Sequence, residues 1–458
     1  MAEWIGAGEA AERLGVKPAT LYSYVSRGVL ARRRAPGGRG SLFDPGEVEA
    51  LSRRGRPRRE VVHGEFVIES GLTEIAGDRL RFRGMDAAQL AVERSFEDVA
   101  ALLWTGTFAH PQPDGPWQAT AEAVAAGTAA QAALPEGTLP LERLQVIVPA
   151  LAATDPLRLH LDPPAVIDAA RSIIAGMVDC LPAAGAPNGA GGAVAGAAGA
   201  LTGAGDGVAG LGGAVAGAGG AVAGASDALP GPPSADGTVA ARLWPKLCPR
   251  RPSPRLLEVL RAALVLLADH ELAASTLAAR VAASVRADPY AVVATGLGAL
   301  GGALHGGASL AAETMLAAAR RPADAPRVVG ELLRRGERIP GFGHFVYESG
   351  DPRAVLLLAQ VRRAAPASAR LAVADAVLAE MRRRSLPEPN IDFALAVLAG
   401  VAGMIPGAGE AVFAVARTAG WLAHALEEYA RRTPLRPRAL YTGPPPREEG
   451  IPVAAGHR

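Results

Sequence analysis

The chain has 458 residues, of which 20% are charged, and its formal net charge is +2. That length can hold two to three domains with substantial cores, and a charge so near zero says little about partners. Its two cysteines, Cys180 and Cys248, show no paired spacing, so neither a disulfide framework nor a cysteine metal site is indicated. The sequence shows neither the basic and then apolar pattern of a signal peptide nor a membrane span. We therefore expect a protein of the reducing cytoplasm.

Charge is distributed unevenly along the chain. Residues 1–60 contain twelve Lys or Arg and seven Asp or Glu, a net charge of +5, which leaves −3 for the remainder. This asymmetry indicates a small basic domain attached to a near-neutral body.

The basic segment predicts two short helices. Residues 5–15 predict a helix that ends at Gly15, and residues 16–25 predict a second helix that begins near Pro18. A helix, a tight turn and a helix form the layout of DNA-reading modules. The next segments, GVL at 28–30, RRR at 32–34 and GSLFD at 40–44, resemble the strand pair and wing of the MerR and excisionase group.

That resemblance implies a small winged helix-turn-helix domain over residues 1–55 that binds double-stranded DNA. Tyr22, Ser23 and Arg27 would lie near the exposed face of the second helix, with the arginines of residues 32–34 toward phosphate. The alternative is a small helical domain kept for packing or oligomer contacts, whose basic residues are merely solvated.

A linker is expected next. The segment SRRGRPRRE at residues 52–60 is charged and contains proline and glycine, and residues 61–83 alternate apolar and polar side chains around Gly71 and Gly77. Such alternation favours short strands. We therefore assign residues 56–80 to a linker and short strands that lead into the main body.

The main body is predicted to be mainly helical. From Ser95 onward the sequence is rich in alanine and leucine, as in residues 256–268 and 411–429, and only 4% of the chain is aromatic. That aromatic content is too low for a typical β-sandwich or barrel. The coarse expectation is an all-helical enzyme.

Residues 183–237 are almost wholly alanine, glycine and small apolar residues. Repeated glycine disfavours a stable helix, and the run lacks large side chains to bury, so we expect a flexible insertion. A membrane segment is the alternative, although leucine, isoleucine and phenylalanine are nearly absent there.

Three short motifs carry the candidate chemistry: LHGGA at 304–308, PGFGH at 340–344 and PNIDF at 389–393. Removing a proton from a thioester methyl group needs a base together with a donor for the developing enolate oxygen. Asp392 can be that base and His305 that donor. His344 can polarise the ketone that the enol carbon attacks.

The ordered motifs resemble the active site of the citrate synthase family. Other segments extend the resemblance over residues 80–444: LRFRGMDAAQLAVERSFEDVAALLWT at 80–105, ADHELAASTLAAR at 268–280, RTAGWLAHALEE at 417–428 and RPRALYTGP at 436–444. The first of these is similar to a signature in which an arginine-glycine turn leads into two short helices.

The resemblance implies a mainly α, two-domain citrate synthase fold. A large domain would cover 81–304, a small domain with active-site loops 305–396 and a return to the large domain 397–444. Residues 445–458 would form a flexible tail.

The resemblance also implies an oxaloacetate site in a homodimer. His270 matches a substrate-binding histidine, Arg353 the arginine after the second catalytic histidine, and Arg417 an arginine that opens the final core helix. Arg436 matches an arginine that reaches the site from the partner subunit. Guanidinium groups suit a dicarboxylate because they pair bidentately and keep their charge.

Some positions depart from the family pattern. Asparagine is frequent where this chain has Leu272-Ala273-Ala274 and Ser309, and a tyrosine or histidine is common where it has Ala394. We expect weaker support for the catalytic groups there, which bears on turnover and ketone preference more than on reaction class. His270 and Glu271 lack a second histidine at helical spacing, so no metal site is expected.

The sequence therefore predicts condensation of acetyl-CoA with oxaloacetate to give citrate and CoA, without a permanently bound cofactor. One alternative is a 2-methylcitrate synthase that uses propionyl-CoA. The other is a DNA-binding transcriptional regulator whose synthase-like body senses an acyl-CoA or oxo acid.

Overall fold

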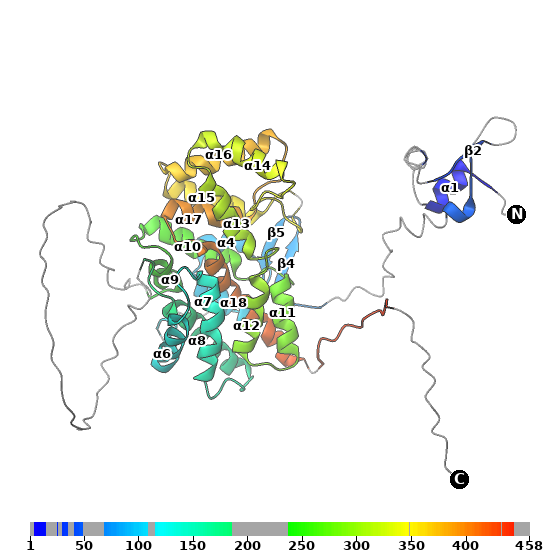
Figure 1. Cartoon of the computed structure of the whole chain (residues 1–458). Coiled ribbons are helices and arrows are strands. Elements are labelled where there is room, and N and C mark those ends of the chain that lie inside the picture. The colour runs from blue at the N-terminus through cyan, green and yellow to red at the C-terminus, as the bar shows by residue number, and fades with distance from the viewer. Residues whose placement is uncertain are drawn as a thin grey trace, which may run out of the picture. The chain divides into compact units, whose positions relative to one another are not determined.

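The computed structural model divides the chain into two compact units, Met1–Glu69 and Ser70–Arg458 (Figure 1). Each is described by itself. The structure describes residues 4–14, 25, 30–34, 41–48, 68–108, 115–185, 237–347, 349–431 and 433–443. The linker at 52–60, most of the alanine- and glycine-rich segment, and the tail at 445–458 lie outside these ranges.

In the first unit, a small antiparallel sheet packs against helix α1 (Ala7–Leu14). The strands of the sheet are β1 (Ile5–Gly6), β2 (Arg33–Arg34) and β3 (Ser41–Phe43). The strand order is β1-β3-β2, and the buried residues include Ile5, Leu30 and Phe43.

This sheet contains the strand pair expected over residues 32–34 and 40–44. The expected first helix is present but begins at Ala7 rather than residue 5, because Ile5 and Gly6 pair with β3. The expected second helix lies outside the described residues apart from Val25, as do Tyr22, Ser23 and Arg27.

The second unit begins with a three-stranded antiparallel sheet of β4 (Thr73–Ala76), β5 (Arg79–Phe82) and β6 (Met85–Asp86). Gly77 and Asp78 join the first two strands with φ of 56° and 53°, the left-handed pair that a two-residue hairpin needs. The strands expected between 61 and 83 are thus present where the chain is described.

The other described elements of the unit are helices, as expected, and polar caps start many of them. Ser95 forms a capping box with Asp98. Thr120, Thr238, Ser253 and Asp288 cap other helices through their side chains. The helices are α4 (Ala87–Glu93), α5 (Phe96–Thr105), α6 (Ala121–Ala132), α7 (Pro140–Ala153), α8 (Pro163–Cys180), α9 (Val239–Leu247), α10 (Pro254–Leu267), α11 (Ala274–Ser284), α12 (Pro289–Leu300), α13 (Gly307–Ala318), the 3-10 turn η1 (Pro322–Asp324), α14 (Ala325–Arg334), α15 (Pro352–Ala364), α16 (Ala369–Arg383), α17 (Ile391–Ala402) and α18 (Ala408–Ala430).

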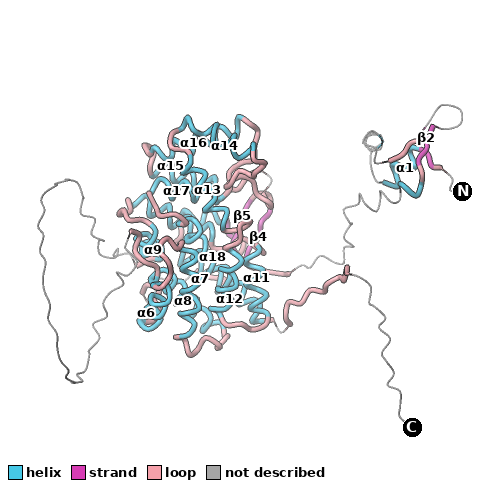
Figure 2. Tube along the Cα trace, in the orientation of Figure 1, coloured by secondary structure: helices cyan, strands magenta, loops and turns pink. Residues whose placement is uncertain are grey.

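Helix α18 is the centre of this unit and is surrounded by other helices (Figure 2). Residues 408–425 of it are all buried, which is typical of a helix covered on every side. Gly296 on α12 permits one close crossing, because a Cβ there would lie 2.6 Å from the Trp421 ring.

The position of Arg417 corrects one expectation. It lies in the middle of α18 rather than at the opening of the final core helix, because the helix already begins after Gly407, whose φ is 78°. Between Gly407 and Arg417 the chain has no proline, and apart from Gly409 its residues permit a continuous helix.

The helices α13 to α17 form the end of the unit that carries the candidate loops (Figure 1). Helices α13 and α15 both pack on α17. His305 precedes α13, His344 precedes α15, and Asp392 lies in the first turn of α17. Among the described helices, none is long and apolar enough to cross a membrane.

Candidate active site

Two expected motifs are connected to each other by backbone and side-chain hydrogen bonds. The Asn390 backbone N–H donates to Gly341 O at 2.9 Å, and its side-chain amide donates to Gly343 O at 2.9 Å. Gly341 and Gly343 both have φ of 80°, and a Cβ on Gly341 would lie 2.8 Å from Phe393. The PGFGH motif needs its glycines because the chain turns tightly against α17.

Asp392 is half-buried at the start of α17, where the Asn390 side-chain oxygen caps its backbone N–H at 3.0 Å. Its carboxylate accepts a hydrogen bond from the Ser309 hydroxyl. Burial raises the pKa of Asp392 to about 6, against the lowering effects of Ser309 and Arg353. A carboxylate whose pKa lies this close to neutrality is suited to general-base work.

His305 is held by a chain of hydrogen bonds. Its Nε2 lies 2.7 Å from Ser275 Oγ, and Trp421 Nε1 donates to the same oxygen at 3.3 Å. Burial and then the Arg417 charge lower the pKa of His305 to about 4, so the ring is neutral. Because the indole N–H can only donate, the Ser275 proton is free to point at Nε2, which favours the tautomer with its proton on Nδ1.

His344 is fixed in the opposite tautomer. Its Nδ1 accepts from the backbone N–H groups of Val346 at 3.0 Å and Tyr347 at 3.4 Å. Burial and then the Arg353 charge lower the pKa of His344 to about 4. A neutral ring that accepts at Nδ1 carries its proton on Nε2. That nitrogen lies 3.3 Å from an Arg353 nitrogen, a contact that is not a hydrogen bond in this tautomer because both groups are donors.

His270 lies beside His344, with ring centroids 5.3 Å apart. It is buried, and its Nε2 lies 2.9 Å from the Tyr347 hydroxyl. Burial holds the pKa of His270 well below its ordinary value, and the Arg353 charge lowers it further. The ring is therefore a neutral hydrogen-bonding group.

Two buried arginines complete this part of the site. Arg353 binds both carboxylate oxygens of Asp351, at 2.9 Å and 2.8 Å. The Arg417 Nε donates to Leu267 O at 2.8 Å, while NH1 and NH2 are buried without a hydrogen-bond partner among the described residues. Burial lowers the pKa of Arg417 to about 10. Arg417 thus stays charged at neutral pH and has two donors to offer an anion.

Phe413 connects this arginine with His305. The Arg417 guanidinium carbon lies 4.7 Å from the Phe413 ring centroid, and the His305 ring lies 5.8 Å from it. Six of the seven expected side chains are thereby linked through direct contacts or through their charges: His270, His305, His344, Arg353, Asp392 and Arg417.

Arg436 is not brought to this cluster. It is exposed, in a segment after α18 that has neither helix nor strand. The nearby Leu435 backbone N–H donates to Ser284 Oγ at 3.1 Å. The expectation that Arg436 reaches a partner's site stays a prediction.

Sequence reasoning missed four residues that contact the expected ones: Ser275, Tyr347, Phe413 and Trp421. Each lies within a segment or next to a motif that was recognised, but only the three-dimensional contacts assign it a partner.

The expected loss of polar support at residue 309 is wrong. Ser309 is buried and donates to Asp392, because the first turn of α13 faces the start of α17. At residues 272–274 and 394, no described side chain supplies a comparable polar contact to the site. Among the described residues, no cluster of three or more His, Cys, Asp or Glu could hold a metal ion.

The chain is similar in sequence to known citrate synthases. The family model described as "Citrate synthase, C-terminal domain" matches residues 62–438. A putative citrate synthase 2 of Mycobacterium tuberculosis H37Rv is 42% identical over 201 residues, which cover 43% of this chain and 54% of that protein. A 2-methylcitrate synthase of Shewanella oneidensis is 33% identical over 225 residues, covering 48% and 59%. The chain thus spans somewhat over half the length of these curated relatives.

The fold is similar to that of solved structures. Citrate synthase from Thermoplasma acidophilum, in a ternary complex with carboxymethyl coenzyme A and oxaloacetate, matches with a TM-score of 0.63 at 22% identity, covering 85% of this chain and 96% of that one. At this identity the likeness establishes the fold alone.

Proposed function

Because the chain belongs to the citrate synthase family, we propose that it condenses acetyl-CoA with oxaloacetate to give citrate and CoA. One observation carries the proposal: Arg417 presents two buried, unpartnered donors within the described site, beside Arg353, two neutral histidines and a carboxylate. A buried guanidinium without an acceptor is costly unless a ligand supplies one.

Oxaloacetate suits this part of the site. Its carboxylates can accept from Arg417 and Arg353, and its ketone oxygen can accept from the Nε2–H of His344. The neutral ring of His270 can form a further hydrogen bond to oxaloacetate. An anion between the two arginines would also offset their mutual repulsion, which contributes to the lowered pKa of Arg417.

The acyl-CoA would react on the other side. Asp392 takes a proton from the thioester methyl group, and the Nδ1–H of His305 stabilises the enol oxygen. The enol carbon then attacks the oxaloacetate ketone, whose oxygen gains a proton from His344. Water cleaves the thioester of the resulting citryl-CoA and releases citrate and CoA.

Propionyl-CoA is the alternative acyl donor, which would make the product 2-methylcitrate. The similarity to the 2-methylcitrate synthase of Shewanella oneidensis supports this alternative. The test is thiol release from each acyl-CoA with oxaloacetate. Release that depends on oxaloacetate supports the synthase, and the faster substrate assigns the acyl chain.

We further propose that the enzyme acts as a homodimer. Helix α11 and the residue after it expose Leu277, Val281 and Val285, with 38%, 44% and 63% of their surface accessible. Their spacing of four places them along one helix face, and a second copy could cover this apolar stripe. Arg436 is exposed, as a residue that reaches a partner's site would be.

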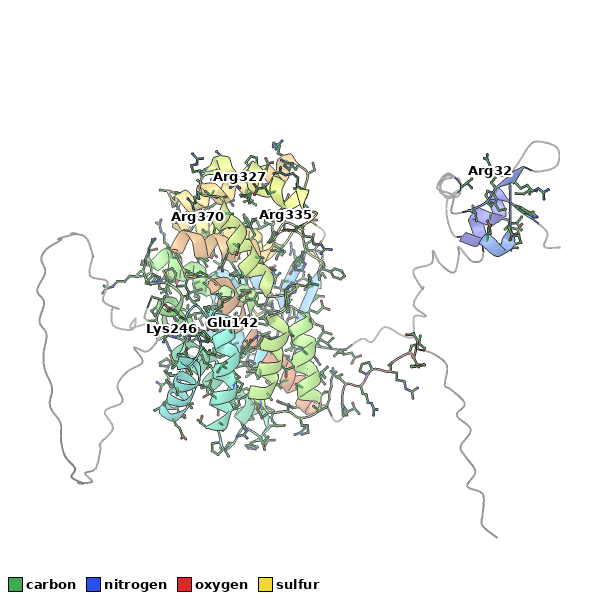
Figure 3. The ribbon with its side chains drawn as sticks, in the orientation of Figure 1. Arg32, Glu142, Lys246, Arg327, Arg335 and Arg370 are labelled. Carbon is green, nitrogen blue, oxygen red and sulfur yellow. The ribbon has the colours of Figure 1, made fainter. Side chains whose placement is uncertain are left out.

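We also propose that the first unit binds duplex DNA. Its exposed basic residues include Arg32, labelled in Figure 3, and Arg33 on β2. The net charge of +5 over residues 1–60 favours contact with phosphates. A regulator that binds an acyl-CoA or oxo acid without turnover is the remaining candidate, and it predicts DNA binding without thiol release.

A further inference from the structure

Ser309 joins two parts of the site that lie far apart in the sequence. It is completely buried in the first turn of α13, four residues after His305. Its backbone N–H donates to Gly306 O at 3.0 Å, so its position follows the HGG turn. Its hydroxyl donates to Oδ1 of Asp392 on α17.

Charged groups surround Asp392 from two other elements. Arg353 and Asp351 face it from the start of α15, and Arg417 and Glu410 act on it from α18. The acidic residue of α13 is engaged elsewhere, because Glu313 accepts from the backbone N–H groups at residues 407 and 409, at 2.8 Å and 2.9 Å. Within the described part of the chain, Ser309 supplies the one side-chain hydrogen bond to the Asp392 carboxylate.

We propose that Ser309 is a positioning residue, which holds one carboxylate oxygen of Asp392 so that the other is directed at the thioester methyl group. The inference rests on the proposed function. It gives the serine a role in the reaction itself. His305 lies just before α13 and supports the enol, while Ser309 in the first turn of the same helix supports the base.

The hydrogen bond also favours the ionised form of the base. Burial raises the pKa of Asp392 to about 6, and the Ser309 hydroxyl opposes that rise. Without the hydroxyl, the pKa of Asp392 should rise further. The base would then be protonated over a wider pH range, so the loss of activity should be largest in acid and smallest in alkali.

The experiment compares kcat between pH 5 and pH 9 in the full chain. Ser309→Ala should move the acid limb of the profile upward by about one pH unit, the scale expected for a hydrogen bond to a charged group. At pH 6 its kcat should fall about fivefold from lost ionisation of the base, and near pH 9 only the smaller loss from a less well held carboxylate should remain. Ser309→Thr keeps the hydroxyl and should restore the acid limb.

Thr314→Ala is the matched control, because Thr314 lies on the same helix but is exposed and binds Leu310 O. It should leave the profile unchanged. An acid limb that does not move in Ser309→Ala, or a loss of the same size at every pH, would overturn the inference.

A second measurement does not depend on turnover. At pH 8, Ser309→Ala should lower the urea midpoint of unfolding, but it should lower it much less in an Asp392→Ala background, where the carboxylate is already gone. Equal shifts in both backgrounds would refute the contact. If the unchanged protein releases no thiol at any pH, the proposed function fails, and the urea measurement still decides whether Ser309 and Asp392 interact.

Discussion

The side-chain amide of Asn390 donates to the carbonyl oxygen of Gly343 at 2.9 Å, across 47 residues of sequence. The same Asn390 caps α17 through its side-chain oxygen. Gly343 directly precedes His344, and Asp392 lies in the capped turn. One side chain therefore fixes the relative positions of the proposed base and the proposed ketone donor.

Two substitutions of Asn390 should separate its contribution to stability from its contribution to activity. Asn390→Ala should cost about 1 kcal/mol of unfolding free energy through the lost cap. Asn390→Asp keeps the capping oxygen but loses the donor to Gly343, so it should retain more stability than the alanine variant while still lowering kcat. Urea unfolding and thiol release measured on both variants separate the two effects. Full activity in Asn390→Asp would show that the bridge to Gly343 is dispensable.

Asp392→Asn tests the base. Thiol release should fall by at least about a hundredfold, the low end of general-base contributions, while oxaloacetate binding, measured by calorimetry, should persist. Because burial raises the pKa of Asp392 to about 6, kcat of the unchanged protein should rise with pH through that value. Near-normal turnover in a folded asparagine variant would remove Asp392 from this role.

The same raised pKa predicts how stability depends on pH. Protonated Asp392 is favoured in the folded protein, so its contribution to stability is fully present below pH 4 and is lost as the pH rises through about 6. Relative to the unchanged protein, Asp392→Asn should gain thermal stability between pH 4 and pH 8. Parallel melting-temperature profiles would contradict the raised pKa.

Arg417→Met tests the anion site. It removes two buried donors that lack a partner among the described residues, so the free protein should be no less stable, whereas oxaloacetate binding should weaken roughly a hundredfold, as expected for two charge-assisted hydrogen bonds. Arg327→Met is the control: Arg327, labelled in Figure 3, forms an exposed ion pair with Glu331. Unchanged affinity in Arg417→Met would place oxaloacetate elsewhere.

Hybrid dimers test Arg436. If it reaches the partner's site, mixing Arg436→Ala with Asp392→Asn protein should create dimers in which one site carries both defects and the other carries neither. Thiol release should then partly return after subunit exchange. Verified hybrids that stay inactive would assign Arg436 to its own subunit's site or remove it from catalysis.

Replacing Arg32 and Arg33 with glutamate tests the first unit. The full-length protein should bind duplex DNA with an affinity that falls steeply as salt rises, because phosphate contacts release counterions. The double variant should lose that binding and keep thiol release, as should a chain shortened to begin near Val61. No gel shift with the unchanged protein at low salt would reject the DNA-reading role.

The sequence predicted the helical body, and its HGG, GFGH and NIDF motifs identified segments that the fold brings together, because these motifs mark positions where backbone and side chain are both constrained. Gly341 shows why: a Cβ there would lie 2.8 Å from Phe393. The start of α18 was harder to predict, since the residues between Gly407 and Arg417 are apolar or small apart from Glu410.

The supporting contacts could not be predicted because they join distant segments. Ser275 meets His305 and Trp421 across 30 and 146 residues. Ser309 was expected to weaken the site, yet its hydroxyl reaches Asp392 across 83 residues. A hydroxyl has no sequence pattern that identifies its partner, so packing of α13 against α17 decides its role.

The most direct test of the account identifies the product. The full-length protein should be incubated with oxaloacetate and either acetyl-CoA or propionyl-CoA, and the products should be identified by mass spectrometry beside the Asp392→Asn variant. The account predicts citrate from acetyl-CoA, formed only with oxaloacetate and at least about a hundredfold more slowly by the variant. Neither citrate nor 2-methylcitrate from the unchanged protein, with oxaloacetate still bound, would contradict it and favour a ligand-sensing regulator.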